Sequence, residues 1–95
     1  MSRTAQAVVT SVADLDTVQD ILAANNRRQG VVIHNTSTAI LYIKYGAAAS
    51  ASSFTYSIAA SSNWTMPADH QYTGLITGLW ATNQSGAAIV TEISA

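Results

Sequence analysis

The sequence predicts an all-β domain, because short β-branched or aromatic runs alternate with clusters of turn-forming residues along most of the chain. The clearest run is residues 54–58, where Phe54, Tyr56 and Ile58 alternate with small polar residues. This alternation is typical of a strand with one buried face. At 95 residues the chain has the length of one domain, and it contains no internal repeat.

Two strands are predicted at residues 31–34 and 40–45, and the turn-forming residues 35–38 between them predict a hairpin. In the second strand, positions 40, 42 and 44 face one side and positions 41, 43 and 45 face the other, which suits a strand with one drier face. Further strands are predicted at residues 54–58, 64–66, 72–80 and 87–93.

The first third of the chain is compatible with either a helix or strands. Apolar residues recur at helical spacing, with acidic residues early and arginines late, as in an amphipathic helix; they are Val12, Leu15, Val18 and Ile21/Leu22. The pairs at residues 8–9 and 17–18 instead favour β-structure. Periodicity alone leaves both alternatives open.

Composition excludes several classes of function. Only 9 % of the residues are charged, against about 25 % in an average soluble domain, and the net charge is −1. Without a basic patch, we expect no binding to nucleic acid or to anionic membranes. The absence of cysteine excludes disulfides and thiol chemistry. A surface with little like-charge repulsion favours association with other copies or partners.

No catalytic or metal-binding constellation is recognisable, so we expect no enzyme activity, no cofactor and no metal. His34 lies in an apolar run, and the neighbours Asp69 and His70 lack a third ligand. The aspartates at positions 14, 16 and 20 lack the pattern of a calcium loop. Neither the Gly-x-Ser-x-Gly elbow nor a phosphate-binding glycine motif occurs.

Function is therefore predicted to lie at interfaces. Aromatic residues anchor interfaces, adjacent arginines can bind a partner's carboxylate, and a β-prone N-terminal segment can add a strand to a neighbour. The second arginine of the pair can equally brace its own turn, and stacked aromatics can alternatively bind carbohydrate. The interface candidates are Val8, Val9, Arg27, Arg28, Trp64, Tyr72 and Trp80.

Four segments together resemble small virion structural proteins of tailed bacteriophages. They are residues 24–35, 41–46, 72–75 together with 78–80, and 90–93. In that pattern an asparagine shortly before an arginine opens a hairpin, an apolar strand ends in asparagine, and a short strand closes on glycine. Asn25, Arg28, Asn35 and Gly46 hold those places here.

The resemblance implies a small antiparallel β-sandwich or jelly-roll-like module of about seven to eight short strands. It also favours strand over helix in the first third of the chain. We expect residues 1–12 to form an extended N-terminal arm, with its β-prone centre at Val8 and Val9, and residues 13–95 to form the single β-sandwich domain.

The function implied is that of a non-enzymatic capsid decoration, or cement, protein. Such a protein would bind the major capsid protein or another virion protein, act as a homotrimer or ring, and reside in the virion after assembly in the host bacterial cytoplasm. A neck or tail component is one alternative. A carbohydrate-binding β-sandwich module is the other.

Overall fold

The computed structural model describes residues 5–15, 17–82 and 84–95 of the chain. The described residues form eight strands, which confirms the all-β prediction. These are β1 (Gln6–Ala13), β2 (Gln19–Leu22), β3 (Arg28–Asn35), β4 (Leu41–Tyr45), β5 (Tyr56–Ile58), β6 (Asn63–Thr65), β7 (Ile76–Trp80) and β8 (Ala87–Ser94). Within these ranges there is no helix long and apolar enough to cross a membrane.

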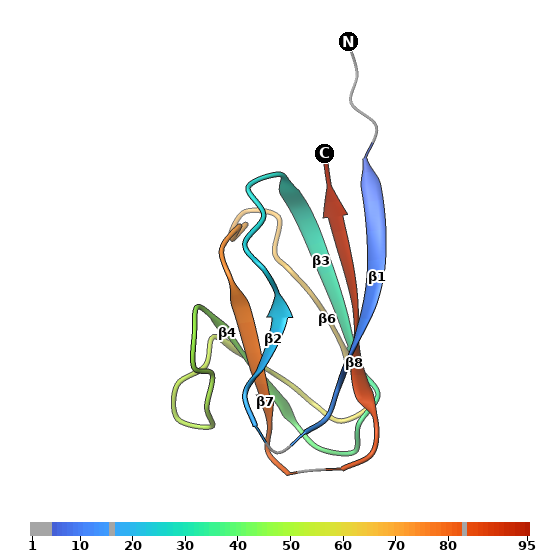
Figure 1. Ribbon diagram of the computed structural model, residues 1–95, viewed down its shortest axis with the longest axis vertical. Helices are drawn as coiled ribbons and strands as arrows, with labels where there is room; N and C mark the ends of the chain where they lie inside the picture. Colours follow the sequence, from blue (N-terminus) through green and yellow to red (C-terminus); the bar gives the residue numbers. More distant parts are fainter. Residues whose placement is uncertain (1–4, 16, 83) are drawn as a thin grey trace.

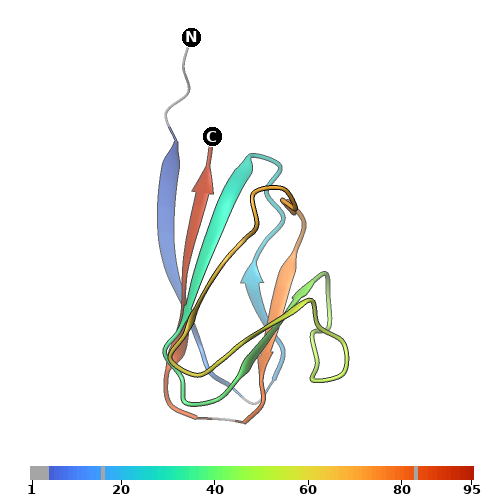
Figure 2. The same ribbon diagram turned by 180° about the vertical axis from the view of Figure 1, so that it is seen from behind.

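The strands form two antiparallel sheets of four strands each, arranged like a sandwich (Figures 1 and 2). Sheet A has the order β1-β8-β3-β6, and sheet B has the order β2-β7-β4-β5. The only two consecutive strands that pair with each other are β4 and β5. Every other connection between described strands passes from one sheet to the other.

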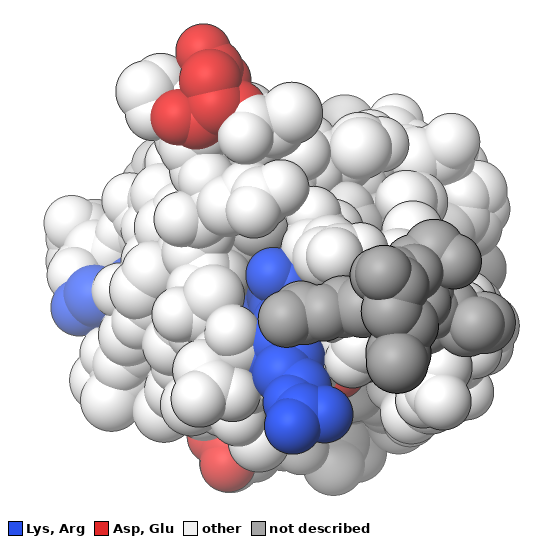
Figure 3. Space-filling model, turned by 90° about the horizontal axis from the view of Figure 1, so that it is seen from above, with Lys and Arg blue, Asp and Glu red and all other residues white. Residues whose placement is uncertain are grey.

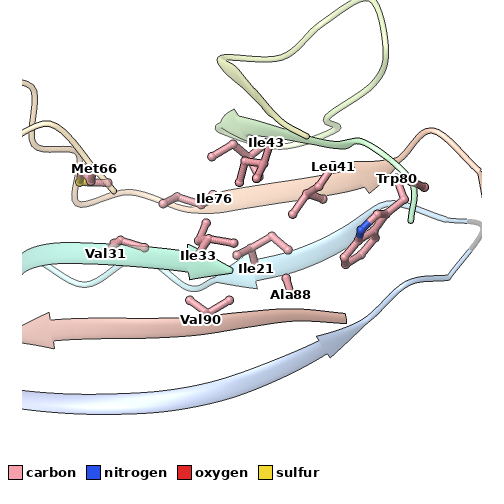
Figure 4. Packing of buried hydrophobic residues seen from close by; sticks show 12 residues of the cluster. Ile21, Val31, Ile33, Leu41, Ile43, Met66, Ile76, Trp80, Ala88 and Val90 are labelled. Carbon is pink, nitrogen blue, oxygen red and sulfur yellow. The ribbon is translucent and has the colours of Figure 1, made fainter. Parts of the chain in front are cut away.

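The core lies between the two sheets and is built from alternate residues of the central strands. Ile33 of β3 and Val90 of β8 point inward from sheet A, and Leu41, Ile43 and Ile76 point inward from sheet B (Figure 4). The alternation predicted for residues 40–45 is confirmed, because Leu41 and Ile43 are buried whereas the preceding Ile40 is exposed. Burial of these aliphatic side chains is the main force that holds the sheets together.

The predicted hairpin between residues 31–34 and 40–45 is wrong. β3 pairs with β8 and β6 in sheet A, whereas β4 pairs with β7 and β5 in sheet B. Both strands bury apolar residues against the same core, so the connection crosses from one sheet to the other. The buried Asn35 side chain holds this crossing, since its amide donates to the carbonyl of Ala39 and its oxygen accepts from the Ser37 N–H.

The first third of the chain forms strands and not the alternative helix. β1 pairs with β8, and β2 pairs with β7. Of the residues at helical spacing, Leu15 and Val18 are exposed, whereas Val12, Ile21 and Leu22 lie in or against the core, so the residues do not form the single buried stripe of a helix. Pairing partners far along the chain outweigh the local helical pattern. Asp16 lies outside the described residues.

Residues 6–12 of the expected N-terminal arm belong to β1, which pairs with β8 from Gln6 to Ala13 without a shift in register. The sheet therefore continues across the expected boundary at residue 13. Residues 1–4 lie outside the described part of the chain.

Each of the four later predicted strands corresponds to an observed one. β5 and β7 are shorter than predicted, because they begin at Tyr56 and Ile76. β6 ends before Met66, where Pro67 follows. β8 agrees with its predicted range to within one residue.

Gly86 closes the end of the sandwich where β7 connects to β8. Its φ of 126° lies in a region that favours glycine, and a Cβ at this position would lie 2.6 Å from the Cα of Ser37. The backbones of two turns can therefore meet only because this residue has no side chain.

We expect Gly86→Ala to destabilise the protein by about 2–5 kcal/mol, as backbone strain and a steric clash with Ser37 add together. Gly46→Ala is the matched control, because Gly46 has a similar φ of 129° but no atom within 4 Å of an added Cβ. The Gly46→Ala variant should lose only about 1–2 kcal/mol of unfolding free energy, from backbone strain alone. Urea unfolding measures both, and equal losses would show that the close approach to Ser37 is unimportant.

Candidate functional site

The residues considered for catalysis or metal binding do not converge. In the described part of the chain, no group of three or more His, Cys, Asp or Glu side chains is placed to hold a metal ion. His34 lies exposed on sheet A beside Asn63, with its ring nitrogen in hydrogen-bond contact with the amide oxygen. Asp69 and His70 are exposed neighbours in a loop. The surfaces and clusters below are therefore the candidates for function.

Arg28 is buried inside the molecule, with 3 % of its surface exposed. Its Nε donates to the Glu92 carboxylate at 2.7 Å. One terminal nitrogen donates to the carbonyls of Tyr72 and Gly74, both at 2.9 Å, and the other donates to the carbonyl of Ala23 at 2.6 Å. The guanidinium thus joins β3 and β8 of sheet A to the segments that follow β2 and precede β7 of sheet B.

This arrangement corrects the prediction that Arg28 contacts a partner. Its donors are used within the fold, so it braces its own end of the sandwich, which was the other interpretation of the arginine pair. A planar guanidinium suits this position because its donors point in several fixed directions at once.

Arg27, by contrast, is exposed at the tip of the β2–β3 turn. Its backbone N–H donates to the side-chain oxygen of Asn25 at 3.0 Å, and its carbonyl accepts from Ala95 at 3.0 Å. These bonds hold the backbone of the turn. Arg27 therefore stays a candidate for contact with an acidic group on a partner.

Two of the predicted aromatic candidates belong to one group of rings, which we call the aromatic cluster: Tyr45, Tyr56, Trp64 and Tyr72. Tyr45 and Tyr72 stack in parallel, with centroids 4.4 Å apart, and Trp64 packs on Tyr56 at 5.1 Å. Trp64 comes from β6 at the edge of sheet A, and Tyr56 comes from β5 at the edge of sheet B. The cluster therefore fills the gap between these two edges and leaves its rings half-buried.

The hydroxyl of Tyr45 is buried in this cluster without a hydrogen-bond partner among the described residues. Burial, with a smaller contribution from the neighbouring Tyr56, raises the pKa of Tyr45 to about 12. The phenol therefore stays neutral across the physiological pH range. Its ring packs against the other rings of the aromatic cluster.

Trp80 is 3 % exposed, which corrects its prediction as an interface residue. Its ring lies in the core, and its Nε1 donates to the side-chain oxygen of Asn35 at 3.0 Å (Figure 4). A buried indole usually satisfies its N–H in this way. Trp80 therefore offers no surface to a partner.

Val8 and Val9 are both exposed, with exposed fractions of 54 % and 63 %. Val8 lies opposite Glu92 on the inner face of sheet A, and Val9 lies opposite Thr91 on the outer face. Both belong to β1, which has a neighbour on one side only. This strand is the longest free edge in the described fold.

The outer face of sheet B carries an apolar surface. The predicted burial of Phe54 on one face with Tyr56 and Ile58 is wrong, because β5 begins only at Tyr56 and Phe54 is 42 % exposed. Ile40 and Phe54 are both exposed, and Phe54 packs on Tyr42 with ring centroids 4.8 Å apart. The predicted alternation in residues 40–45 was a usable signal, because it placed Ile40 opposite the buried Leu41.

Charged side chains are sparse and isolated on the visible surface. Figure 3 looks down on the end where β1 and β3 begin and β8 ends, and most of this surface is uncharged. Strong steering of charged partners is therefore not expected from this end.

Comparison with known proteins finds no matching family model, no matching curated protein and no matching solved structure.

We expect Arg28→Lys to lower the free energy of unfolding by about 2–4 kcal/mol. An ammonium group cannot reach the four oxygens that the guanidinium joins, so buried acceptors lose their partners. Arg27→Lys is the matched control at the adjacent exposed position and should change stability by less than about 0.5 kcal/mol. Denaturant unfolding tests both variants, and similar effects at the two positions would contradict an internal role for Arg28.

The Tyr45 hydroxyl predicts a loss of stability in alkali. The folded protein holds this proton more tightly than the unfolded chain, so the stabilisation is complete below pH 10.0 and is lost as the pH rises towards about 12. Tyr45→Phe should lose less stability over this interval than the wild type. Tyr42→Phe, on the outer face of sheet B, is the control and should behave as the wild type does. Thermal unfolding from pH 9 to 12 would show whether the two variants differ.

Proposed function

We propose that this protein is a non-enzymatic structural component of a tailed-phage particle, which decorates the capsid as a homo-oligomer with a jelly-roll fold. The observation that carries this proposal is the strand order, β1-β8-β3-β6 facing β2-β7-β4-β5. Eight antiparallel strands in two sheets, with connections that switch sheets, are typical of jelly rolls, and these occur in viral capsid and lectin domains.

A fold alone does not determine function, so the surface must also suit the role. Interface centres are depleted in charge and enriched in apolar and aromatic side chains. The exposed Ile40 and Phe54 on sheet B and the exposed Val8 and Val9 on β1 have this character. Only 9 % of the residues are charged, so copies of the protein can approach one another and the shell without strong repulsion.

The mechanism in this proposal is adhesion. The outer face of sheet B, around Ile40 and Phe54, contacts the major capsid protein, and Arg27 is available for an acidic group on the shell. Residues 1–12 act as the arm towards neighbouring subunits, and residues 6–12 of this segment are the β1 strand. The rigid sandwich between these contacts resists deformation.

Purified protein should co-sediment with tailed-phage heads that lack it, with saturation, and should raise the temperature at which those heads rupture. Phe54→Ser should weaken binding by at least about tenfold, because it removes an exposed aromatic anchor. Thr65→Ser, at an exposed position on sheet A, is the control and should bind as the wild type does. Binding to tails but not heads would instead support the neck or tail alternative.

Carbohydrate binding is the second candidate, and the aromatic cluster is the observation that favours it. Its rings stack on one another, however, so Tyr45 and Tyr72 each have one face already covered. A glycan titration separates the two functions. A saturable change in tryptophan fluorescence, without binding to heads, would support the carbohydrate-binding module and contradict the decoration role.

A further inference from the structure

The four sheet edges of the described fold differ sharply. β5 and β6 have three residues each, and β2 has four residues with a shift in register between Asp20 and Leu22. β1 has eight residues and pairs with β8 without any shift. The described fold therefore has one long and regular free edge, β1, and three edges that are short or irregular.

Free sheet edges usually carry features that prevent pairing with other chains. Short length, proline, inward-pointing or edge charges and bulges are the common ones. The β1 sequence, Gln6–Ala13, contains no charged residue and no proline. Figures 1 and 2 both show β1 at the outside of sheet A, with β8 on one side and no described segment on the other.

We propose that β1 pairs in antiparallel fashion with β1 of a second copy about a two-fold axis, which joins the two four-stranded A sheets into one continuous sheet. A partner strand that pairs along the whole edge must itself be a long free edge. Among the described strands of this chain, only β1 meets that condition. Because the strand is uncharged, self-pairing brings no like charges together.

Symmetry restricts the register of this pairing. A two-fold axis perpendicular to the sheet places outer face beside outer face, so each residue pairs with one of the same parity. We place the axis at Val9, the most exposed large hydrophobic residue of the strand, so that it meets the partner's Val9. Val8 then lies opposite the partner's Thr10 on the inner face. Paired β-branched side chains stabilise such contacts.

The dimer goes beyond the decoration role and does not depend on it. An isologous contact closes after two copies, whereas the trimer or ring implied by the phage resemblance needs a different kind of contact. The two proposals can therefore fail separately. Self-association is measured without capsids, and capsid binding is measured with a dimer-deficient variant.

A cysteine scan tests the contact directly, because the chain has no cysteine of its own. Directly opposed residues of antiparallel strands have Cα atoms about 4.5–5.5 Å apart, within the range that a disulfide spans. Val9→Cys should form covalent dimers under mild oxidation, and cysteines at Val8 and Thr10 should form fewer. Thr65→Cys, exposed at the opposite edge of sheet A, is the control and should stay uncrosslinked.

A maximum of crosslinking at one β1 position supports self-pairing and identifies the residue on the axis. Uniform crosslinking at all positions, Thr65 included, overturns it, and so does the absence of crosslinking along β1.

Light scattering without oxidation gives an independent test. The wild type should reach the mass of a dimer as its concentration rises towards about 1 mM. Val9→Lys and Val9→Glu should each weaken association by at least about tenfold, because like charges meet at the axis, and mixing the two variants should restore it. Thr65→Lys should dimerise as the wild type does. Circular dichroism should show unchanged folding, since Val9 is largely exposed.

A wild-type monomer at every concentration, a trimer or ring, or a Val9→Lys variant that dimerises normally would each overturn the proposal. Pairing of β1 with a strand of a capsid protein alone would also overturn it. In that case the wild type is monomeric in solution, and the cysteine at Val9 crosslinks only to the shell.

Discussion

The buried guanidinium of Arg28 is the interaction on which the architecture depends most. At the end of the sandwich where it lies, the chain passes between the two sheets, and the passing segments carry carbonyls that point inward. Arg28 binds the carbonyls of Ala23, Tyr72 and Gly74 together with the Glu92 carboxylate. A buried cation is tolerated only when it is paired and hydrogen-bonded. Here the acceptors lie on β8, on the segment before β7 and on the segment after β2. The same contacts that stabilise the charge therefore hold the sheets in place.

The opposite end is closed by neutral amides and hydroxyls together with one carboxylate. Asn35 binds the carbonyl of Ala39 and the indole of Trp80, and the Ser37 hydroxyl donates to Asp14. Gly86 lets the last turn approach this group closely. A chain of 95 residues without cysteine has a thin core and no covalent staples, so buried side chains that bond to the backbone at both ends supply much of its specificity.

Several of the few charged residues form bonds inside the fold, so the surface carries little charge. Little charge on the surface favours association with other copies or partners. Arg28, Glu92 and Asp14 all contribute to internal bonds. The outer face of sheet B and the β1 strand then present exposed apolar side chains, Ile40 and Phe54 on the first and Val8 and Val9 on the second. Such surfaces are found where proteins meet other proteins, and an uncharged regular edge adds backbone hydrogen-bonding groups to that tendency. The proposed adhesion to a shell and the proposed pairing of β1 both draw on this property.

The sequence by itself determined which residues form most strands and, for residues 40–45, which side is buried, because alternation with a period of two is a local pattern. It located the strands around Ile43, Ile58 and Val90, and it identified Val8 and Val9 as apolar residues in a β-prone segment. Only the tertiary structure decided which sheet each strand joins, because pairing partners such as β1 and β8 lie at opposite ends of the chain. It also separated Arg27 from Arg28. The two are chemically identical neighbours in the sequence. The shift in register between Arg28 and Gly30, together with the carbonyls that converge on Arg28, places Arg28 inside the molecule and leaves Arg27 in solvent.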